Sequence, residues 1–252
     1  MTLTALIFIC IAGFIAAAVD SIAGGGGIIS LPALIAIGVP PHLALGTNKF
    51  ASTCASLTSS IKFARSGKIH FPLVKYQIPC TIVGAALGVY TALRLDEGFL
   101  NVFIVIMIFV VAIYTIIKKD FGTSDRFKGL SKAKIVYGML FAFGLGFYDG
   151  FFGPGTGSFL IFLFISVFGF DFTVAAGNGK MLNFVSNVVS LILFALSGKI
   201  MYLIGIPMAI SMIFGAYVGT HIAIKNGAKV IKPIFITIAL LLIIKLIWQA
   251  VF

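Results

Sequence analysis

Two glycine-rich stretches interrupt hydrophobic segments at matching places in the two halves of the chain. They are Asp20-Ser-Ile-Ala-Gly-Gly-Gly-Gly27 and Asp149-Gly-Phe-Phe-Gly-Pro-Gly-Thr-Gly157. Lipid cannot satisfy the N–H and C=O groups that a broken helix frees, so such backbone occurs at membrane depth only where protein covers it or a water-filled cavity adjoins it. Paired breaks in two repeated halves therefore predict a central binding site.

The composition is that of a membrane protein. Hydrophobic residues make up 60% of the chain and charged residues 10%, and the mean hydropathy is +1.17, whereas soluble domains are about 45–50% apolar. We therefore expect an all-α, polytopic, multi-pass protein of the cell (inner) membrane. Several apolar segments reach the ~20 residues that a spanning helix needs. Ten segments lie near residues 3–19, 27–39, 43–64, 72–93, 99–117, 134–148, 156–170, 173–196, 203–224 and 231–251.

The second and seventh of these segments are too short to cross a bilayer comfortably. They cover residues 27–39 and 156–170, and each adjoins one of the glycine-rich stretches. We expect each to be a half-helix, a re-entrant piece or one arm of a hairpin whose turn is the glycine loop.

The chain contains an internal repeat. Phe63-Ala-Arg-Ser-Gly-Lys-Ile69 matches Phe194-Ala-Leu-Ser-Gly-Lys-Ile200, and Lys49 matches Lys180 at the same spacing. The glycine-rich stretches align at a spacing two residues shorter. Many identities at one spacing predict two repeats of five apolar segments each. The expected divisions are a first membrane repeat over residues 1–117, a cytoplasmic linker over 118–134 and a second membrane repeat over 135–252.

The distribution of Lys and Arg predicts the orientation. These residues gather in the regions 62–75, 118–134 and 225–232, and positively charged short loops stay in the cytoplasm. If all ten segments cross, the three regions fall on one side and only Arg94 and Lys199 lie opposite. Each half then crosses an odd number of times, so we predict inverted topology. If the short segments dip and return, the halves are parallel and the charges separate less well.

The net charge and the Cys and His residues do not indicate a metal, a cofactor or a nucleic-acid partner. The formal net charge of +11 is explained by loops anchored beside anionic lipid, so the bilayer is an expected partner and nucleic acid is not. Cys10, Cys54 and Cys80 are scattered, and His42 and His221 show no ligand spacing. We predict no metal site and no cofactor. The sequence does not predict an oligomeric state.

Four charged residues lie within or beside apolar segments, namely Asp20, Lys49, Asp149 and Lys180. A charge near the bilayer centre costs ~2.5–3.5 kcal/mol on insertion scales, so each must be compensated. If the third segment begins near Pro41, Lys49 lies roughly eight residues along it, at a depth of ~12 Å. That depth approaches the middle of a ~30 Å core. Because Lys180 is its repeat equivalent, we expect the two lysines to converge.

The arrangement predicts a site for an anion. Two ammonium groups and the N–H groups at the starts of two half-helices supply complementary charge. Asp20 and Asp149 are candidates for coupling to a proton or another cation. The predicted substrate-binding residues share a charge, an amide or a close backbone approach: Gly24, Gly25, Gly26, Gly27, Asn48, Lys49, Gly153, Gly155, Thr156, Gly157, Asn178, Lys180 and Asn183.

Each of these roles has a structural alternative. The lysines could pair with the aspartates or extend to an interface, and the aspartates could cap helices or brace loops. The glycines could serve close helix packing, and the asparagines could form hydrogen bonds between helices.

Several motifs carry a family resemblance. Val19-Asp-Ser-Ile-Ala-Gly-Gly-Gly-Gly27, Leu31-Pro-Ala-Leu34, Gly38-Val-Pro-Pro41 and Leu45-Gly-Thr-Asn-Lys49 resemble the signature of the TauE/SafE family of membrane permeases. The stretch Asp149–Gly157 is similar to the other signature of that family. The resemblance covers nearly the whole chain. Family members are implicated in moving sulfite and organosulfur anions, so the resemblance implies a transporter of small sulfur-containing anions, in either direction.

The predicted function is a secondary carrier with alternating access, in which one repeat bundle rocks against the other around the two glycine loops and two lysines. An anion channel is the first alternative, because the same site could conduct if both gates opened together. An intramembrane enzyme that uses Asp20 and Asp149 is the second, since Tyr148-Asp149 resembles half of an aspartyl protease signature. The Gly-x-Gly-Asp half is missing, so we expect no enzymatic activity.

Overall fold

A computed structural model describes residues 2–96, 98, 99 and 126–226. Regular structure in these residues is entirely helical, which confirms the predicted all-α class. The predicted segments at 99–117 and 231–251 and most of the predicted linker lie outside the described residues. The predictions of five segments per repeat and of inverted topology therefore stay predictions.

The described helices follow the predicted segments closely. The seventh segment is divided into a short α-helix and a π-helical turn, which ends at Gly169 in a left-handed conformation (φ 79°). The elements are α1 (Leu3–Ala23), α2 (Gly27–Ala36), α3 (Pro41–Arg65), α4 (Phe71–Ala92), α6 (Lys132–Phe151), α7 (Thr156–Leu163), η1 (Phe164–Phe168), α8 (Phe172–Leu196) and α9 (Tyr202–Asn226).

Local sequence accounts for several helix ends. Asp171 caps α8, because its Oδ1 accepts hydrogen bonds from the backbone N–H groups of Thr173 at 2.8 Å and Val174 at 3.3 Å. Pro41 occupies the first turn of α3, where its missing N–H costs nothing. Gly67 and Gly198 follow the ends of α3 and α8 with φ of 66° and 65°. These repeat-equivalent turns therefore end both long helices in the same way.

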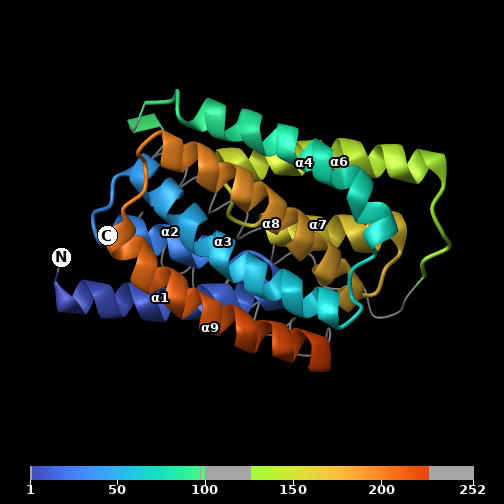
Figure 1. The fold of residues 1–252 in the computed structure, drawn as a ribbon, viewed down its shortest axis with the longest axis horizontal. Coiled ribbons are helices and arrows are strands. Elements are labelled where there is room, and N and C mark those ends of the chain that lie inside the picture. The colour runs from blue at the N-terminus through green and yellow to red at the C-terminus, as the bar shows by residue number, and fades with distance from the viewer. Residues whose placement is uncertain (1, 97, 100–125, 227–252) are drawn as a thin grey trace, which may run out of the picture.

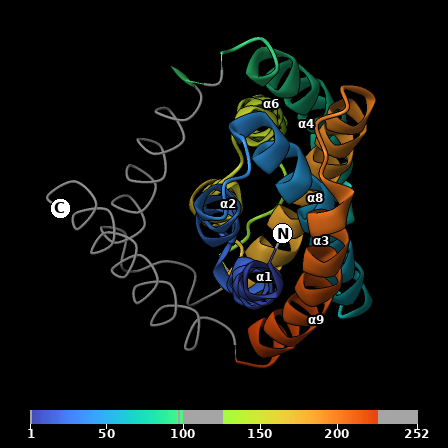
Figure 2. The same ribbon diagram turned by 90° about the vertical axis from the view of Figure 1, so that its left-hand side faces the viewer.

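The helices form two layers, with the short helices in the middle of one of them. In Figure 1, α4 lies beside α6 along one edge and α9 lies beside α1 along the opposite edge, with α3 and α8 between them. Figure 2 shows α1, α2 and α6 on one side, facing the wall formed by α4, α8, α3 and α9. The short helices α2 and α7 thus lie within the bundle.

Glycines set the close packing along both edges, and each edge joins one half of the chain to the other. A Cβ added to Gly84 of α4 would lie 2.2 Å from the carbonyl oxygen of Phe143 in α6. A Cβ added to Gly215, its repeat equivalent in α9, would lie 2.2 Å from the carbonyl oxygen of Phe14 in α1. Small residues allow such backbone contact between membrane helices. The two halves are therefore interlocked.

The outward surface is apolar. Large side chains such as Leu140 and Leu203 are 63% and 76% exposed. Four helices, α1, α4, α8 and α9, are long and apolar enough to cross a membrane. The protein is a multi-pass membrane protein, and its lipid-facing side chains surround a more polar interior.

Candidate functional site

The two glycine-rich loops touch each other at the centre of the bundle. Gly24 has φ 73°, and a Cβ on it would lie 2.2 Å from the backbone nitrogen of Ser158. The Ser158 hydroxyl donates a hydrogen bond to the Ala23 carbonyl oxygen at 3.0 Å. Because backbone meets backbone here, only glycine fits at position 24. The loops of the two halves therefore form one unit.

Each loop is held by side chains from the helix that precedes or follows it. The Gly26 N–H donates to Asp20 Oδ1 at 3.2 Å, so the carboxylate braces the start of α2. In the second loop, the Tyr148 hydroxyl donates to the Pro154 carbonyl oxygen at 2.7 Å. The Thr156 hydroxyl donates to the carbonyl oxygen of Gly153, also at 2.7 Å. These bonds fix the entry into each short helix.

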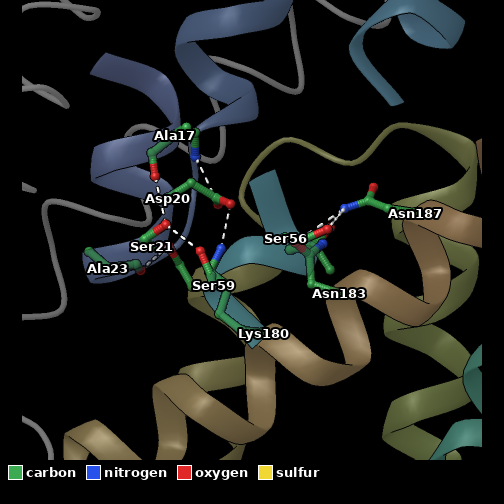
Figure 3. A network of polar contacts seen from close by, with 12 residues as sticks. Ala17, Asp20, Ser21, Ala23, Ser56, Ser59, Lys180, Asn183 and Asn187 are labelled. Atoms are coloured by element: carbon green, nitrogen blue, oxygen red, sulfur yellow. Dashed lines mark hydrogen bonds and ion pairs between the residues drawn. The ribbon is translucent and has the colours of Figure 1, made fainter. Parts of the chain in front are cut away.

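Lys49 and Lys180 each form an ion pair with an aspartate from the other half of the chain. Lys49 Nζ lies 3.0 Å from Asp149 Oδ2, and Lys180 Nζ contacts Asp20 Oδ2. Figure 3 shows the Lys180 side chain extending from its helix toward Asp20 on α1. The pairing compensates charges that are costly at membrane depth. Pairing with the aspartates was the structural alternative to an anion-binding role for the lysines.

The Lys49–Asp149 pair is almost completely buried, and each member has a further polar partner. The two side chains are 3% and 2% exposed. Lys49 Nζ donates to Asn187 Oδ1 at 3.1 Å, and the Ser186 hydroxyl donates to Asp149 Oδ2. A buried ion pair is stable only when further hydrogen bonds satisfy its remaining donors and acceptors. Those further bonds are present at this pair.

The Lys180–Asp20 pair is more open. The Lys180 side chain is 2% exposed, but that of Asp20 is 21% exposed. Beside it, the hydroxyl groups of Ser21 and Ser59 lie 2.7 Å apart. Asp20 is therefore the most accessible charge of the two pairs.

A small cavity of about 20 Å³ lies between the loops, the two pairs and the long helices α3 and α8. Most of its wall is polar side chain or glycine backbone, and Met212 is the apolar exception. Its lining residues are Asp20, Gly25, Gly26, Gly27, Asn48, Lys49, Ser52, Asp149, Gly153, Gly155, Gly157, Asn183, Asn187 and Met212. Most of the predicted site residues are therefore brought together around one cavity.

Four predicted residues do not line this cavity. Gly24 packs on the other loop, Thr156 is bonded to Gly153, and Lys180 lies behind Asp20. Asn178 lies elsewhere, because its Oδ1 accepts the backbone N–H of His70 at 2.7 Å, in the loop between α3 and α4. Its repeat equivalent Thr47 accepts the N–H of Met201 at 3.0 Å. Both bonds brace a turn of the opposite repeat.

The predicted set omitted Ser52, Ser186, Asn187 and Met212. The first three lie on the helices that carry the lysines, about one or two turns further along. Residues three or four apart share a helix face, so counting along α3 and α8 from the lysines would have found Ser52 and Asn187. Figure 3 shows Asn183 and Asn187 of α8 near Ser56 of α3. No periodic signal distinguishes Met212 from the other apolar residues of α9.

The side chains that commonly bind metal ions are not clustered in the described residues. Within the ranges 2–96 and 126–226, no group of three or more His, Cys, Asp or Glu side chains could hold a metal ion. Cys10, Cys54 and Cys80 are half-buried free thiols. The arrangement is one of paired charges, amides and backbone N–H groups, which suits reversible binding of a charged solute.

Curated proteins match this chain over nearly its whole length. A 34% identical protein of Haemophilus influenzae, named a probable membrane transporter protein, matches over 98% of this chain and 95% of its own length. A 35% identical probable membrane transporter protein of Sinorhizobium sp matches over 96% and 92%. The probable membrane transporter protein YunE of Bacillus subtilis is 22% identical over 98% of both chains. No solved structure matches significantly.

The family assignment follows from the same comparisons. The family model described as "Sulfite exporter TauE/SafE" matches residues 9–246. That range includes both glycine loops and both ion pairs, and it confirms the resemblance seen in the sequence motifs. The chain belongs to the TauE/SafE family of membrane transporters.

Proposed function

We propose that this protein is a secondary carrier for small anions, with sulfur-containing oxyanions or organosulfonates as substrates. The observation that carries the proposal is the pair of crossed lysine–aspartate contacts beside a polar cavity, Lys49 with Asp149 and Lys180 with Asp20. A structural role alone needs no cavity next to such charges. The family description, which names sulfite export, supports the sulfur-containing class of substrate.

The cavity offers donors that suit an oxyanion. The amide oxygen of Asn48 accepts the Ser30 hydroxyl at 2.6 Å, and that of Asn183 accepts from Asn187 Nδ2 at 3.3 Å. Within the described part of the chain neither amide nitrogen donates a hydrogen bond, so both are donors for a ligand. Lys49 adds a point charge, and the backbone N–H groups at the start of α2 add the positive end of a helix dipole. A sulfonate or sulfite head presents three oxygens to such a set.

Transport requires that the cavity open to each side in turn. The glycine loops and the crossed ion pairs join the two halves at this point, so any relative movement of the halves must change them. We propose that anion binding and ion-pair exchange drive alternating access, with Asp20 and Asp149 as coupling groups. This mechanism needs neither a covalent intermediate nor a cofactor.

Thermal stabilisation of the detergent-purified protein tests binding directly. A ligand that binds only the native state raises its unfolding temperature by mass action. The panel contains sulfite, thiosulfate, sulfoacetate, taurine and toluenesulfonate, with acetate, phosphate and neutral amino acids as comparisons. We expect selective stabilisation by one sulfur anion, which is weakened in Lys49→Met and retained in Lys132→Met, a substitution of an exposed lysine in the first turn of α6. No response to any anion would contradict the proposal.

Reconstitution distinguishes a carrier from the alternative of an anion channel. Vesicles loaded with unlabelled substrate take up a labelled trace above its equilibrium level only if the protein carries substrate by alternating access. We expect such counterflow, with a rate that saturates with concentration. Uptake that follows the membrane potential alone and does not saturate would favour the channel.

A further inference from the structure

We infer that Asp20, and not Asp149, takes up the proton that accompanies the anion. This assignment deepens the proposed function and rests on it. With both ion pairs intact, the four charged groups sum to zero. A proton on Asp20 changes that sum to +1, which matches one monovalent anion in the adjacent cavity.

The first observation is the difference in access to solvent. Both carboxylates line the cavity, but the Asp20 side chain is 21% exposed and that of Asp149 is 2% exposed. A proton and an anion that arrive through the cavity reach Asp20 directly. Asp20 also contacts Lys180, which does not line the cavity.

The second observation is a difference in hydrogen bonding, which follows from a difference in sequence between the two halves. Asp149 accepts a hydrogen bond from the Ser186 hydroxyl, and its partner Lys49 donates to Asn187. The repeat equivalents of these two helpers are Ala55 and Ser56. Alanine has no hydroxyl to donate, so the first half lacks an equivalent of the Ser186–Asp149 bond. Among the described residues, the Asp20 carboxylate accepts only the Gly26 N–H beside its contact with Lys180, so fewer hydrogen bonds must rearrange when it takes up a proton.

The charges that face Asp20 from its neighbours are few. Lys180 of α8 contacts it, and Lys49 of α3 and Asp149 of α6 line the same cavity. The short helices α2 and α7 contain no titratable side chain. The titratable residues of α9, which also packs on α1, do not line the cavity. Among the described residues, protonation on the Asp20 side of the cavity therefore depends mainly on Asp20 and Lys180.

The binding step balances in charge and in protons. The carboxylate of Asp20 takes one proton from water and becomes a neutral acid, while Lys180 stays an ammonium ion. The negative charge that repelled an anion is removed, and the positive charge behind it is no longer neutralised. One proton and one monovalent anion enter together, so the complex gains no net charge.

The test compares the pH dependence of anion binding in matched variants. Methanesulfonate is the first probe and toluenesulfonate the second, because both keep one negative charge between about pH 5 and about pH 8. In the wild type we expect the Kd to rise about tenfold per pH unit once Asp20 of the free protein is ionised. In Asp20→Asn we expect this dependence to vanish. In Ser186→Ala, which disturbs Asp149 without changing its charge, we expect the dependence to remain, whatever the affinity.

A second measurement does not depend on any variant being stable. Adding methanesulfonate to weakly buffered wild-type protein should raise the pH of the solution, by about one proton taken up per anion bound. Anion binding with no proton uptake, or a pH dependence that persists in Asp20→Asn, would overturn the assignment and leave the carrier intact. If neither sulfonate nor any other anion bound the wild type, the assignment and the proposed function would fall together.

Discussion

The glycine contacts that pack the helices are matched in the two halves of the molecule, whereas the two ion pairs are not. A Cβ on Gly46 would lie 1.9 Å from the carbonyl oxygen of Lys199, and a Cβ on its equivalent Gly177 would lie 2.0 Å from that of Lys68. At the centre, one ion pair is fully buried and the other is open at Asp20. The repeat thus builds a symmetrical frame around an asymmetrical site.

The glycine loops show the same contrast in their backbones. Gly24 and Gly25 have positive φ in the first loop, at 73° and 96°. In the second loop the positive angles are at Gly153 and Gly155, at 100° and 85°, and Pro154 stands between them. Proline cannot adopt a positive φ, so the second loop must turn differently. The two loops therefore differ in backbone conformation where binding is proposed.

The frame also limits how the halves can move. Backbone lies against glycine along both edges, and such contacts tolerate little sliding because interiors are close-packed. The predicted rocking of one repeat against the other would have to shift these contacts as well. We therefore expect the motion to be concentrated at the short helices and their loops, where the central contacts are polar and can exchange.

Removing the lysine from one central ion pair at a time should have the largest effect on stability. The two losses should differ, because the aspartates of the two pairs differ in exposure. Lys49→Met leaves Asp149 buried without its cation, and losing one partner of a buried pair costs ~3–5 kcal/mol. Lys180→Met leaves Asp20, which water can reach, so its cost should be smaller. Thermal unfolding in detergent measures both.

The control for this comparison removes both members of the buried pair. The double variant Lys49→Met with Asp149→Leu should recover much of the stability lost in Lys49→Met, because no uncompensated charge remains. It should still fail to bind anions. Equal losses of stability for the two single variants would show that the exposure of Asp20 does not reduce the cost of removing its lysine.

Most of the helical frame was predictable from the sequence. The ends of α3 and α8 follow from Pro41, Asp171 and the matched Gly67 and Gly198, which are local signals. The convergence of charges was predictable from their cost in lipid and from the repeat.

The pairing of charges across the repeats was not predictable in the same way. Which lysine meets which aspartate depends on how α1 packs against α8 and how α6 packs against α3, and no short-range pattern records that. Asn178 shows the same limit. It lies two residues from Lys180 in sequence, yet it points to His70 rather than to the cavity, because adjacent positions on a helix face different directions.

Substituting the glycines that pack the helices should lower stability by an intermediate amount, which should be equal in the two halves. Gly46→Ala and Gly177→Ala each place a Cβ against a carbonyl oxygen that cannot move without its loop. We expect each to lower the free energy of unfolding toward the upper end of the ~1–3 kcal/mol typical of overpacking. Thermal unfolding is again the measurement.

Gly144→Ala is the matched control for these variants. Gly144 lies within α6, has no atom within 4 Å of an added Cβ, and has a φ outside the positive region. Alanine there should be neutral or stabilising by up to ~1 kcal/mol. A large difference between Gly46→Ala and Gly177→Ala would contradict the symmetry of the frame.

The smallest expected effect comes from removing two hydrogen bonds that brace turns outside the cavity, and it tests whether these residues belong to the binding site. Thr47→Val and Asn178→Val each remove the acceptor of one backbone N–H, that of Met201 or His70. Each should cost ~0.5–1.5 kcal/mol, the net value of one such bond. Because both bonds brace turns away from the cavity, anion affinity measured by thermal shift should stay unchanged in both. Loss of affinity in Asn178→Val alone would return Asn178 to the binding site and would show that the asymmetry of the centre extends into the frame.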